Sequence, residues 1–127
     1  MLGGKNVAAA LAVSDLDRAR TFYEGTLGLE SQQEDPGSIL YRSGSSMVLV
    51  YTSEYAGTNR ATAATWAVGD DFDGIVEGLR GKGVAFERYD DLPGVVREGD
   101  VHLIGDFKGV WLKDPDGNIL SLVNMAM

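Results

Sequence analysis

The stretch VAAALAVSDLDRARTFYEGTLG, residues 7–28, contains an apolar run, a polar break and an amphipathic segment in that order. The apolar run ends at Val13, and the break that follows predicts Ser14 as the N-cap of a helix with acidic residues in its first turn. Gly28 predicts the end of this helix in a left-handed conformation. The stretch therefore predicts a strand followed by a helix, whose apolar positions at helical spacing are Leu16, Ala19, Phe22, Tyr23 and Leu27.

The same order recurs in TAATWAVGDDFDGIVEGLRGKG, residues 62–83. Val13 and Val68 end the two apolar runs, Gly28 and Gly83 end the two helical segments, and 55 positions separate the members of each pair. A repeat at a fixed offset indicates two copies of one supersecondary unit. We expect a single domain over residues 1–127, with module one at about 5–53, a linker at about 53–61 and module two at about 62–127.

Short β-rich runs separated by turn residues follow each predicted helix. In module two, we expect a looser stretch over residues 89–106 and then a hairpin around Asp114-Pro115-Asp116-Gly117-Asn118, in which Asp and Asn bond the local backbone. The pattern predicts an α+β chain of two tandem βαβββ modules. The strands expected after the helices are 29–33, 39–42 and 47–52 in module one, and 84–88, 110–113 and 119–123 in module two.

Two motifs resemble those of the vicinal-oxygen-chelate superfamily, which groups glyoxalase I, bleomycin-resistance proteins and extradiol dioxygenases. One is VSDLDRA at residues 13–19, with Phe22-Tyr23 and Leu27-Gly28-Leu29 after it, and the other is DPDGN at residues 114–118. The resemblance covers nearly the whole chain. It implies a cupped mixed β-sheet with the helices on the outside, and a homodimer. Because one fold hosts many activities, it implies the fold more strongly than the function.

The composition excludes several classes of protein. The formal net charge is −8 and no cluster of Lys and Arg is present, so we expect no nucleic-acid partner. The acidity favours solubility or, alternatively, attracts a cationic ligand. The absence of cysteine excludes disulfides and thiolate ligands. No run approaches the roughly 18 apolar residues of a membrane span and no secretory signal is evident, so we expect no membrane partner and a cytoplasmic location.

Metal-using members of the superfamily take their ligands from the first and last strands of the two modules. The resemblance places Ala8, Leu49, Ala63 and Ser121 at these positions, and none of them is a useful ligand for a divalent cation. His102 is the only histidine of the chain, so a familiar histidine–carboxylate site cannot be assembled. We therefore expect no metal and no cofactor.

Alternation along the strands predicts which side chains face a ligand in the cup. Alanines on the first strand leave room, while Tyr41, Tyr51 and Trp111 form aromatic walls with polar handles. Matching the two hairpins by a fixed offset directs Ile39 and Tyr41 to this face. Alternatively, the aromatic residues pack against one another or a second subunit. His102 is either an ordinary residue or a polar contact at the rim. The candidate ligand-binding residues are Tyr41, Met47, Tyr51, Thr65, His102, Trp111, Lys113 and Ser121; no catalytic residue is assigned.

Three functions are compatible with these features. The first is a metal-independent protein that encloses an aromatic or cationic small molecule, as drug-sequestering resistance proteins of the superfamily do. The second is a superfamily enzyme, such as a lyase, an isomerase or a dioxygenase-like protein, that acts on a small oxygenated metabolite. The third is a scaffold whose own side chains fill the cup. The missing metal ligands favour the first over the second, and the alanines favour it over the third.

Overall fold

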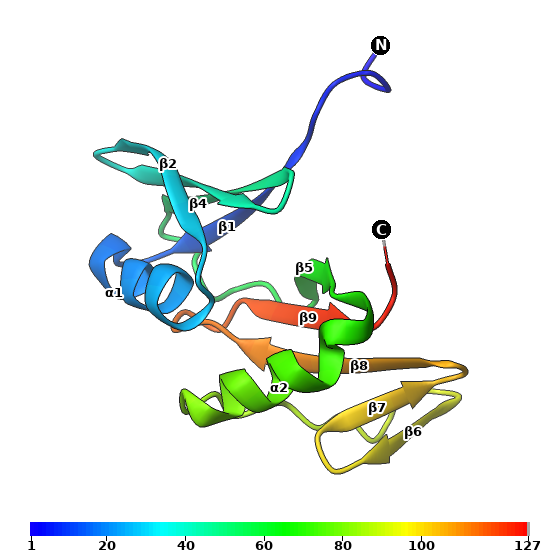
Figure 1. Cartoon of the computed structure of the whole chain (residues 1–127). Coiled ribbons are helices and arrows are strands. Elements are labelled where there is room, and N and C mark those ends of the chain that lie inside the picture. Colours follow the sequence, from blue (N-terminus) through cyan, green and yellow to red (C-terminus); the bar gives the residue numbers. More distant parts are fainter. Residues whose placement is uncertain (127) are drawn as a thin grey trace. The chain divides into compact units, whose positions relative to one another are not determined.

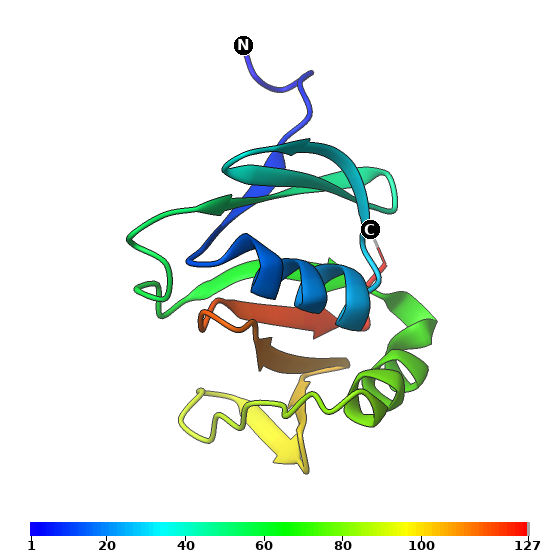
Figure 2. The ribbon, with the colours of Figure 1, turned by 90° about the vertical axis from the view of Figure 1, so that its left-hand side faces the viewer.

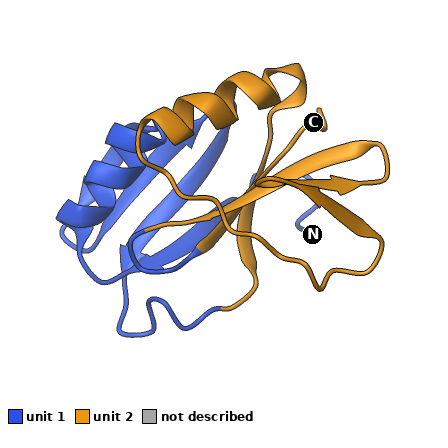
Figure 3. Cartoon of the chain, turned by 90° about the horizontal axis from the view of Figure 1, so that it is seen from below, with its two compact units in different colours: residues 1–59, 115–118 blue, residues 60–114, 119–127 orange. Residues whose placement is uncertain are grey.

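A computed structural model describes residues 1–126 of the chain (Figure 1). Its contacts divide the chain into two compact units, coloured separately in Figure 3. Unit 1 comprises Met1–Asn59 and Pro115–Asn118, and unit 2 comprises Arg60–Asp114 and Ile119–Met127. Each unit contains one mixed sheet and helical segments, which confirms the predicted α+β class.

Unit 1 contains a four-stranded sheet in the order β1-β4-β3-β2. β1 pairs with β4 in parallel, whereas the other neighbouring strands are antiparallel. The helical segment α1–η1 lies along the sheet (Figure 2), and α1 contacts β4. The elements are β1 (Ala8–Val13), α1 (Leu16–Arg20), the π-helix η1 (Thr21–Thr26), β2 (Glu30–Asp35), β3 (Ser38–Ser43) and β4 (Ser46–Thr52).

The predicted first helix is present, with two differences from expectation. Asp15, not Ser14, is its N-cap, because the Asp15 Oδ1 atom accepts hydrogen bonds from the backbone N–H groups of Asp17 and Arg18 at 2.9 and 3.1 Å. The second half of the helix is a π-helix, in which the Leu27 N–H donates to the Phe22 carbonyl. Among the described residues, no helix has the length and apolar character needed to cross a membrane.

Unit 2 contains a five-stranded sheet in the order β5-β9-β8-β7-β6, with β5 parallel to β9 and the remaining neighbours antiparallel. It repeats the unit 1 topology and adds one strand, β6. The elements are β5 (Thr62–Ala67), the 3₁₀-helix η2 (Gly69–Asp71), α2 (Phe72–Gly81), β6 (Val95–Glu98), β7 (Val101–Ile104), β8 (Phe107–Lys113) and β9 (Ile119–Val123).

The strand predicted at residues 84–88 is wrong, and a hairpin lies in the stretch that was expected to be loose. β6 and β7 pair across Gly99-Asp100, a two-residue turn of the type that favours hairpins. β7 is short, and its pairing with β8 runs only from His102 opposite Gly109 to Ile104 opposite Phe107. Farther along β8, the Glu87 N–H donates to the Trp111 carbonyl at 2.8 Å. Residues 84–88 therefore run beside β8 without forming a strand.

The side chains of β8 and β9 alternate as predicted. The Lys108 ammonium pairs with the Asp73 carboxylate of α2 at 3.6 Å, so the even-numbered positions of β8 face the helix. Val110 and Leu112 follow Lys108 on this face and are fully buried. Trp111, directly opposite Ser121 of β9, consequently lies on the face of the sheet away from α2.

In unit 1, the prediction that Ile39 and Tyr41 face away from the helical segment is wrong. Tyr41 is fully buried, and its ring stacks on Tyr23 of η1 with a centroid separation of 6.1 Å. The Tyr41 hydroxyl donates to the Glu24 Oε2 atom at 2.8 Å. Ile39, two residues away on the same strand, faces the same side and is also buried.

The lengths of the two hairpin turns explain this error. Residues 44–45 form the turn between the paired Ser43 and Ser46, whereas residues 114–118 connect the paired Lys113 and Ile119. The turns thus differ by an odd number of residues. Because side chains alternate with a period of two, matching the hairpins by one fixed offset inverts the face of one strand.

The turn at residues 115–118 makes long-range contacts within unit 1. The Asn118 Nδ2 atom donates to the Ala12 carbonyl of β1 at 2.7 Å, and Asn118 is only 5% exposed. The Asp116 Oδ1 atom accepts from the backbone N–H and hydroxyl of Ser14, and from Arg18. The motif that predicted a local hairpin turn therefore also holds the end of β1 and the start of α1.

Candidate functional site

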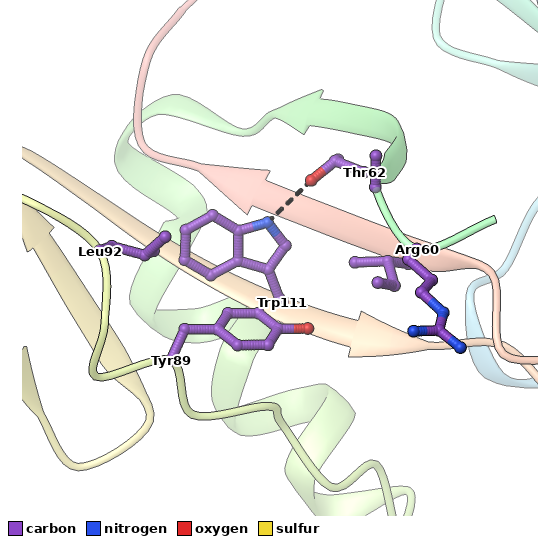
Figure 4. A pocket seen from close by; sticks show the side chains of 7 residues that line it. Arg60, Thr62, Tyr89, Leu92 and Trp111 are labelled. Atoms are coloured by element: carbon purple, nitrogen blue, oxygen red, sulfur yellow. Dashed lines mark hydrogen bonds between the residues drawn. The ribbon is translucent and has the colours of Figure 1, made fainter.

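A pocket of about 300 Å³ opens on the face of the five-stranded sheet away from α2 (Figure 4). Trp111 of β8 forms one wall. Its indole Nε1 donates to the Thr62 hydroxyl at 3.1 Å, and its ring meets the Tyr89 ring at 72° with a centroid separation of 5.3 Å. The pocket combines this aromatic pair with aliphatic and polar side chains; its lining is Arg60, Ala61, Thr62, Tyr89, Leu92, Trp111 and Ile119.

Two local features bring Thr62 and Tyr89 to Trp111. The pairing of β5 with β9 shifts register between Thr62 and Ala64, and this irregularity places Thr62 opposite Ile119. Two hydrogen bonds fix the segment that contains Tyr89. The Glu87 N–H donates to the Trp111 carbonyl, and the Tyr89 N–H donates to the His102 Nε2 atom. The pocket wall therefore depends on long-range pairing.

His102 lies behind the pocket wall, so the second of the two interpretations of this residue, a polar contact at the rim, is wrong. His102 is fully buried in β7, and its ring contacts the Trp111 indole edge to face, with a centroid separation of 4.7 Å. Its Nε2 atom accepts the Tyr89 backbone N–H at 3.0 Å, so the proton of the neutral imidazole lies on Nδ1. Within residues 1–126, Nδ1 is buried without a hydrogen-bond partner. His102 therefore packs against the Trp111 ring and binds the Tyr89 backbone from behind the pocket wall.

Hydrogen-bond donors dominate the polar part of the pocket. Among the described residues, no carboxylate pairs with the Arg60 guanidinium, and the Tyr89 hydroxyl is buried without a partner. Burial raises the pKa of Tyr89, and the negative charge of Glu87 raises it further. Glu87 is engaged by Lys113, whose ammonium lies 3.2 Å from a carboxylate oxygen. The Thr62 oxygen already accepts the Trp111 N–H, so its own hydrogen is free to donate.

The structure brings only some of the sequence-predicted residues together. Trp111 lines the pocket and His102 contacts it, whereas Thr65, Lys113 and Ser121 share the open face of the sheet outside the pocket lining. The Ser121 hydroxyl donates to that of Thr65 at 2.9 Å. The other three predicted residues belong to unit 1: Met47 and Tyr51 lie on the face of β4 opposite the buried Val48 and Val50, and Tyr41 lies in the core.

Sequence reasoning missed Arg60, Thr62, Tyr89 and Leu92 as lining residues. Alternation on β5 directs Thr62 toward the helix, and only the register shift reverses it. Tyr89 and Leu92 follow the helix in a stretch without strand periodicity. The aromatic ring of Tyr89, directly after the run that was predicted as a strand, is the one signal in the sequence that marked this segment.

The residues at the superfamily's metal-ligand positions do not fit a divalent cation. Ala8, Leu49 and Ala63 have no side-chain donor atom, and the Ser121 hydroxyl is bonded to Thr65. In the part of the chain that the structure describes, no group of three or more His, Asp or Glu side chains is arranged to hold a metal ion. The donor set therefore supports no metal-dependent step.

Comparisons with known proteins agree with the fold. A family model described as the Glyoxalase/Bleomycin resistance protein/Dioxygenase superfamily matches residues 6–122. No curated protein sequence matches significantly.

Several solved structures are similar over nearly their full length. A glyoxalase/bleomycin resistance protein/dioxygenase from Alicyclobacillus acidocaldarius is 22% identical, with 97% of this chain and 93% of that chain covered and a TM-score of 0.69. The fosfomycin resistance protein FosX from Mesorhizobium loti is 16% identical, with 100% and 96% covered and a TM-score of 0.70. Lactoylglutathione lyase from Agrobacterium tumefaciens is 19% identical, with 97% and 95% covered and a TM-score of 0.70. At these identities the similarity is one of fold.

Proposed function

Because the chain belongs to the Glyoxalase/Bleomycin resistance protein/Dioxygenase superfamily, we propose that it binds a small organic molecule in the pocket beside Trp111, without a metal ion. The main observation behind this proposal is that neighbouring side chains fix the Trp111 indole in place. The Trp111 N–H donates to the Thr62 hydroxyl, and the rings of Tyr89 and His102 contact the indole ring. A volume of about 300 Å³ lies at the lower end of the range of small-molecule sites.

The same lining favours binding over catalysis. A general base must lie within about 3 Å of the proton that it removes. None of the seven described lining residues is a carboxylate or a histidine, and the Nε2 atom of the nearby His102 already accepts a backbone N–H. The described lining therefore offers no carboxylate or imidazole base to an enzyme acting on an oxygenated metabolite, the alternative considered from the sequence.

The proposed role is sequestration of an aromatic drug or metabolite by a cytoplasmic homodimer. The similarity in fold to FosX, a fosfomycin resistance protein, supports resistance as one setting for such binding. β1 and β5 are edge strands of their sheets, and exposed edges invite pairing with a second chain. These features support the homodimer as part of the proposal.

Ligand screening with variants of two tryptophans tests the binding site. Compounds that raise the melting temperature of the wild type would be titrated against Trp111→Ala, Trp111→Phe and Trp66→Phe. Trp66 is a matched control, because it pairs with Leu122 on the other face of the same sheet. We expect Trp66→Phe to retain affinity and Trp111→Ala to lose about two- to tenfold, from an aromatic contribution of roughly 0.5–1.5 kcal/mol.

A change in affinity can be attributed to the site only if the variant is folded, so circular dichroism would check the fold of each variant before titration. Trp111→Phe keeps an aromatic ring and serves where the alanine variant is destabilised. Unchanged affinity in a folded Trp111→Ala variant would contradict the site. Native mass spectrometry of the purified protein would report bound metal, retained ligand and oligomeric state in one measurement.

A further inference from the structure

Arg60 is exceptional among the arginines of this acidic chain. The chain has seven arginines, and six of them form ion pairs with Asp or Glu side chains. Arg60 lines the pocket, and no carboxylate among residues 1–126 pairs with it. A guanidinium has five N–H donors and no acceptor, and its planar fork matches a carboxylate. Arg60, the one arginine without an acidic partner among residues 1–126, is therefore available to a ligand.

Two of the lining residues, Thr62 and Tyr89, carry hydroxyl groups. The Tyr89 hydroxyl is buried without a partner within the described residues, and an unsatisfied buried polar group costs free energy until it is paired. The Thr62 oxygen accepts the Trp111 N–H, so the hydroxyl hydrogen of Thr62 is left for a separate acceptor. The polar side chains of the lining thus offer donors and no negative charge.

The donors and the apolar surface occupy different parts of the pocket. Figure 4 shows the Tyr89 hydroxyl and the Arg60 side chain toward one end, with Leu92 at the other end beside the Trp111 ring. The Trp111 and Tyr89 rings, which contact each other edge to face, offer flat apolar surface between the two ends of the pocket. From this arrangement, and on the basis of the binding function proposed above, we infer that the ligand is an aromatic carboxylate, with its carboxylate at Arg60 and its ring against Trp111.

Calorimetric titration of three probes with one ring system tests the inference. Naphthoate carries a negative charge, naphthalenemethanol is neutral, and naphthylmethylammonium carries a positive charge. At low ionic strength we expect naphthoate to bind the wild type at least about tenfold more tightly than either of the others, because charge-assisted hydrogen bonds are the stronger kind. Arg60→Gln should abolish this preference, and Arg60→Lys should restore only part of it.

A matched control separates the local effect of Arg60 from net charge. Arg42→Gln makes the same charge change at an exposed residue that pairs with Glu30 in unit 1 and does not line the pocket. It should leave naphthoate affinity within about twofold of the wild type, as expected for a surface ion pair. An equal loss in Arg42→Gln and Arg60→Gln would overturn the assignment of Arg60.

The possible outcomes distinguish this inference from the binding function itself. Trp111-dependent binding of the alcohol or the ammonium probe, with naphthoate no tighter than these, would overturn the carboxylate inference and leave the binding function standing. Failure of all three probes to bind would contradict both. Naphthoate binding that needs both Trp111 and Arg60 would support both.

Discussion

Removing the hydroxyl group should destabilise the protein at Tyr41 but not at Tyr89, although each change deletes one oxygen atom from a tyrosine that packs inside the protein. The Tyr41 hydroxyl donates to the Glu24 carboxylate at 2.8 Å, and burial, followed by this bond, raises the pKa of Tyr41. The Tyr89 hydroxyl is buried and has no partner among residues 1–126. Tyr41→Phe thus loses an interaction, whereas Tyr89→Phe removes an unsatisfied group.

The magnitudes follow from these partners. Hydrogen bonds to charged groups contribute about 1.5–3 kcal/mol. The Glu24 side chain is 33% exposed and stays partly hydrated, so we expect Tyr41→Phe to lose roughly 1–2 kcal/mol. Leaving a buried donor unpaired costs about 1–3 kcal/mol, part of which Tyr89→Phe recovers. We expect Tyr89→Phe to equal the wild type or to exceed it by up to about 1 kcal/mol.

Urea unfolding followed by circular dichroism measures both effects. With a slope of about 1–3 kcal/mol per molar urea, the two variants should differ in midpoint by roughly 1 M. Tyr55→Phe, at a residue that is 70% exposed, is the control and should stay within about 0.5 kcal/mol of the wild type. A Tyr89→Phe variant as unstable as Tyr41→Phe would refute the reasoning, because it would show that the Tyr89 hydroxyl is bonded in the folded protein.

Three further predictions concern other contacts. Asn118→Ala should lower the free energy of unfolding by about 1–3 kcal/mol in urea titrations, because the Ala12 carbonyl loses the donor that lies 2.7 Å from it. Asn118→Asp should be no more stable than Asn118→Ala, because its carboxylate would face the Ala12 carbonyl. Hydrogen bonds from Arg80 and then Arg88 hold the pKa of Asp100 below 3.8, so its contribution to stability is present above about pH 4 and is lost as the pH falls through the lower pKa of the folded state. Asp100→Asn should therefore flatten the acid limb of stability against pH, and an unchanged limb would contradict the pairing. Sedimentation should give a dimer, and a species of 13.6 kDa at micromolar concentration would contradict the homodimer.

Local sequence determined the two strand–helix units of this protein. Caps, helical periodicity and glycine conformation act over a few residues, so they can be read without knowledge of distant contacts. Gly28 and Gly83 have the positive φ angles, 75° and 89°, that their positions after the helical segments predicted. The orientation of Trp111 also followed from alternation within one strand.

Tertiary structure alone decided which face Tyr41 occupies and where the pocket lies. The face of Tyr41 depends on whether the turn between paired strands has an odd or an even length, which alternation within one strand does not encode. The pocket forms because the Glu87 and Tyr89 N–H groups bond Trp111 and His102 across 24 and 13 positions of the chain. Such bonds arise from the geometry of the assembled sheet, so the residues that complete the site became visible only in the folded protein.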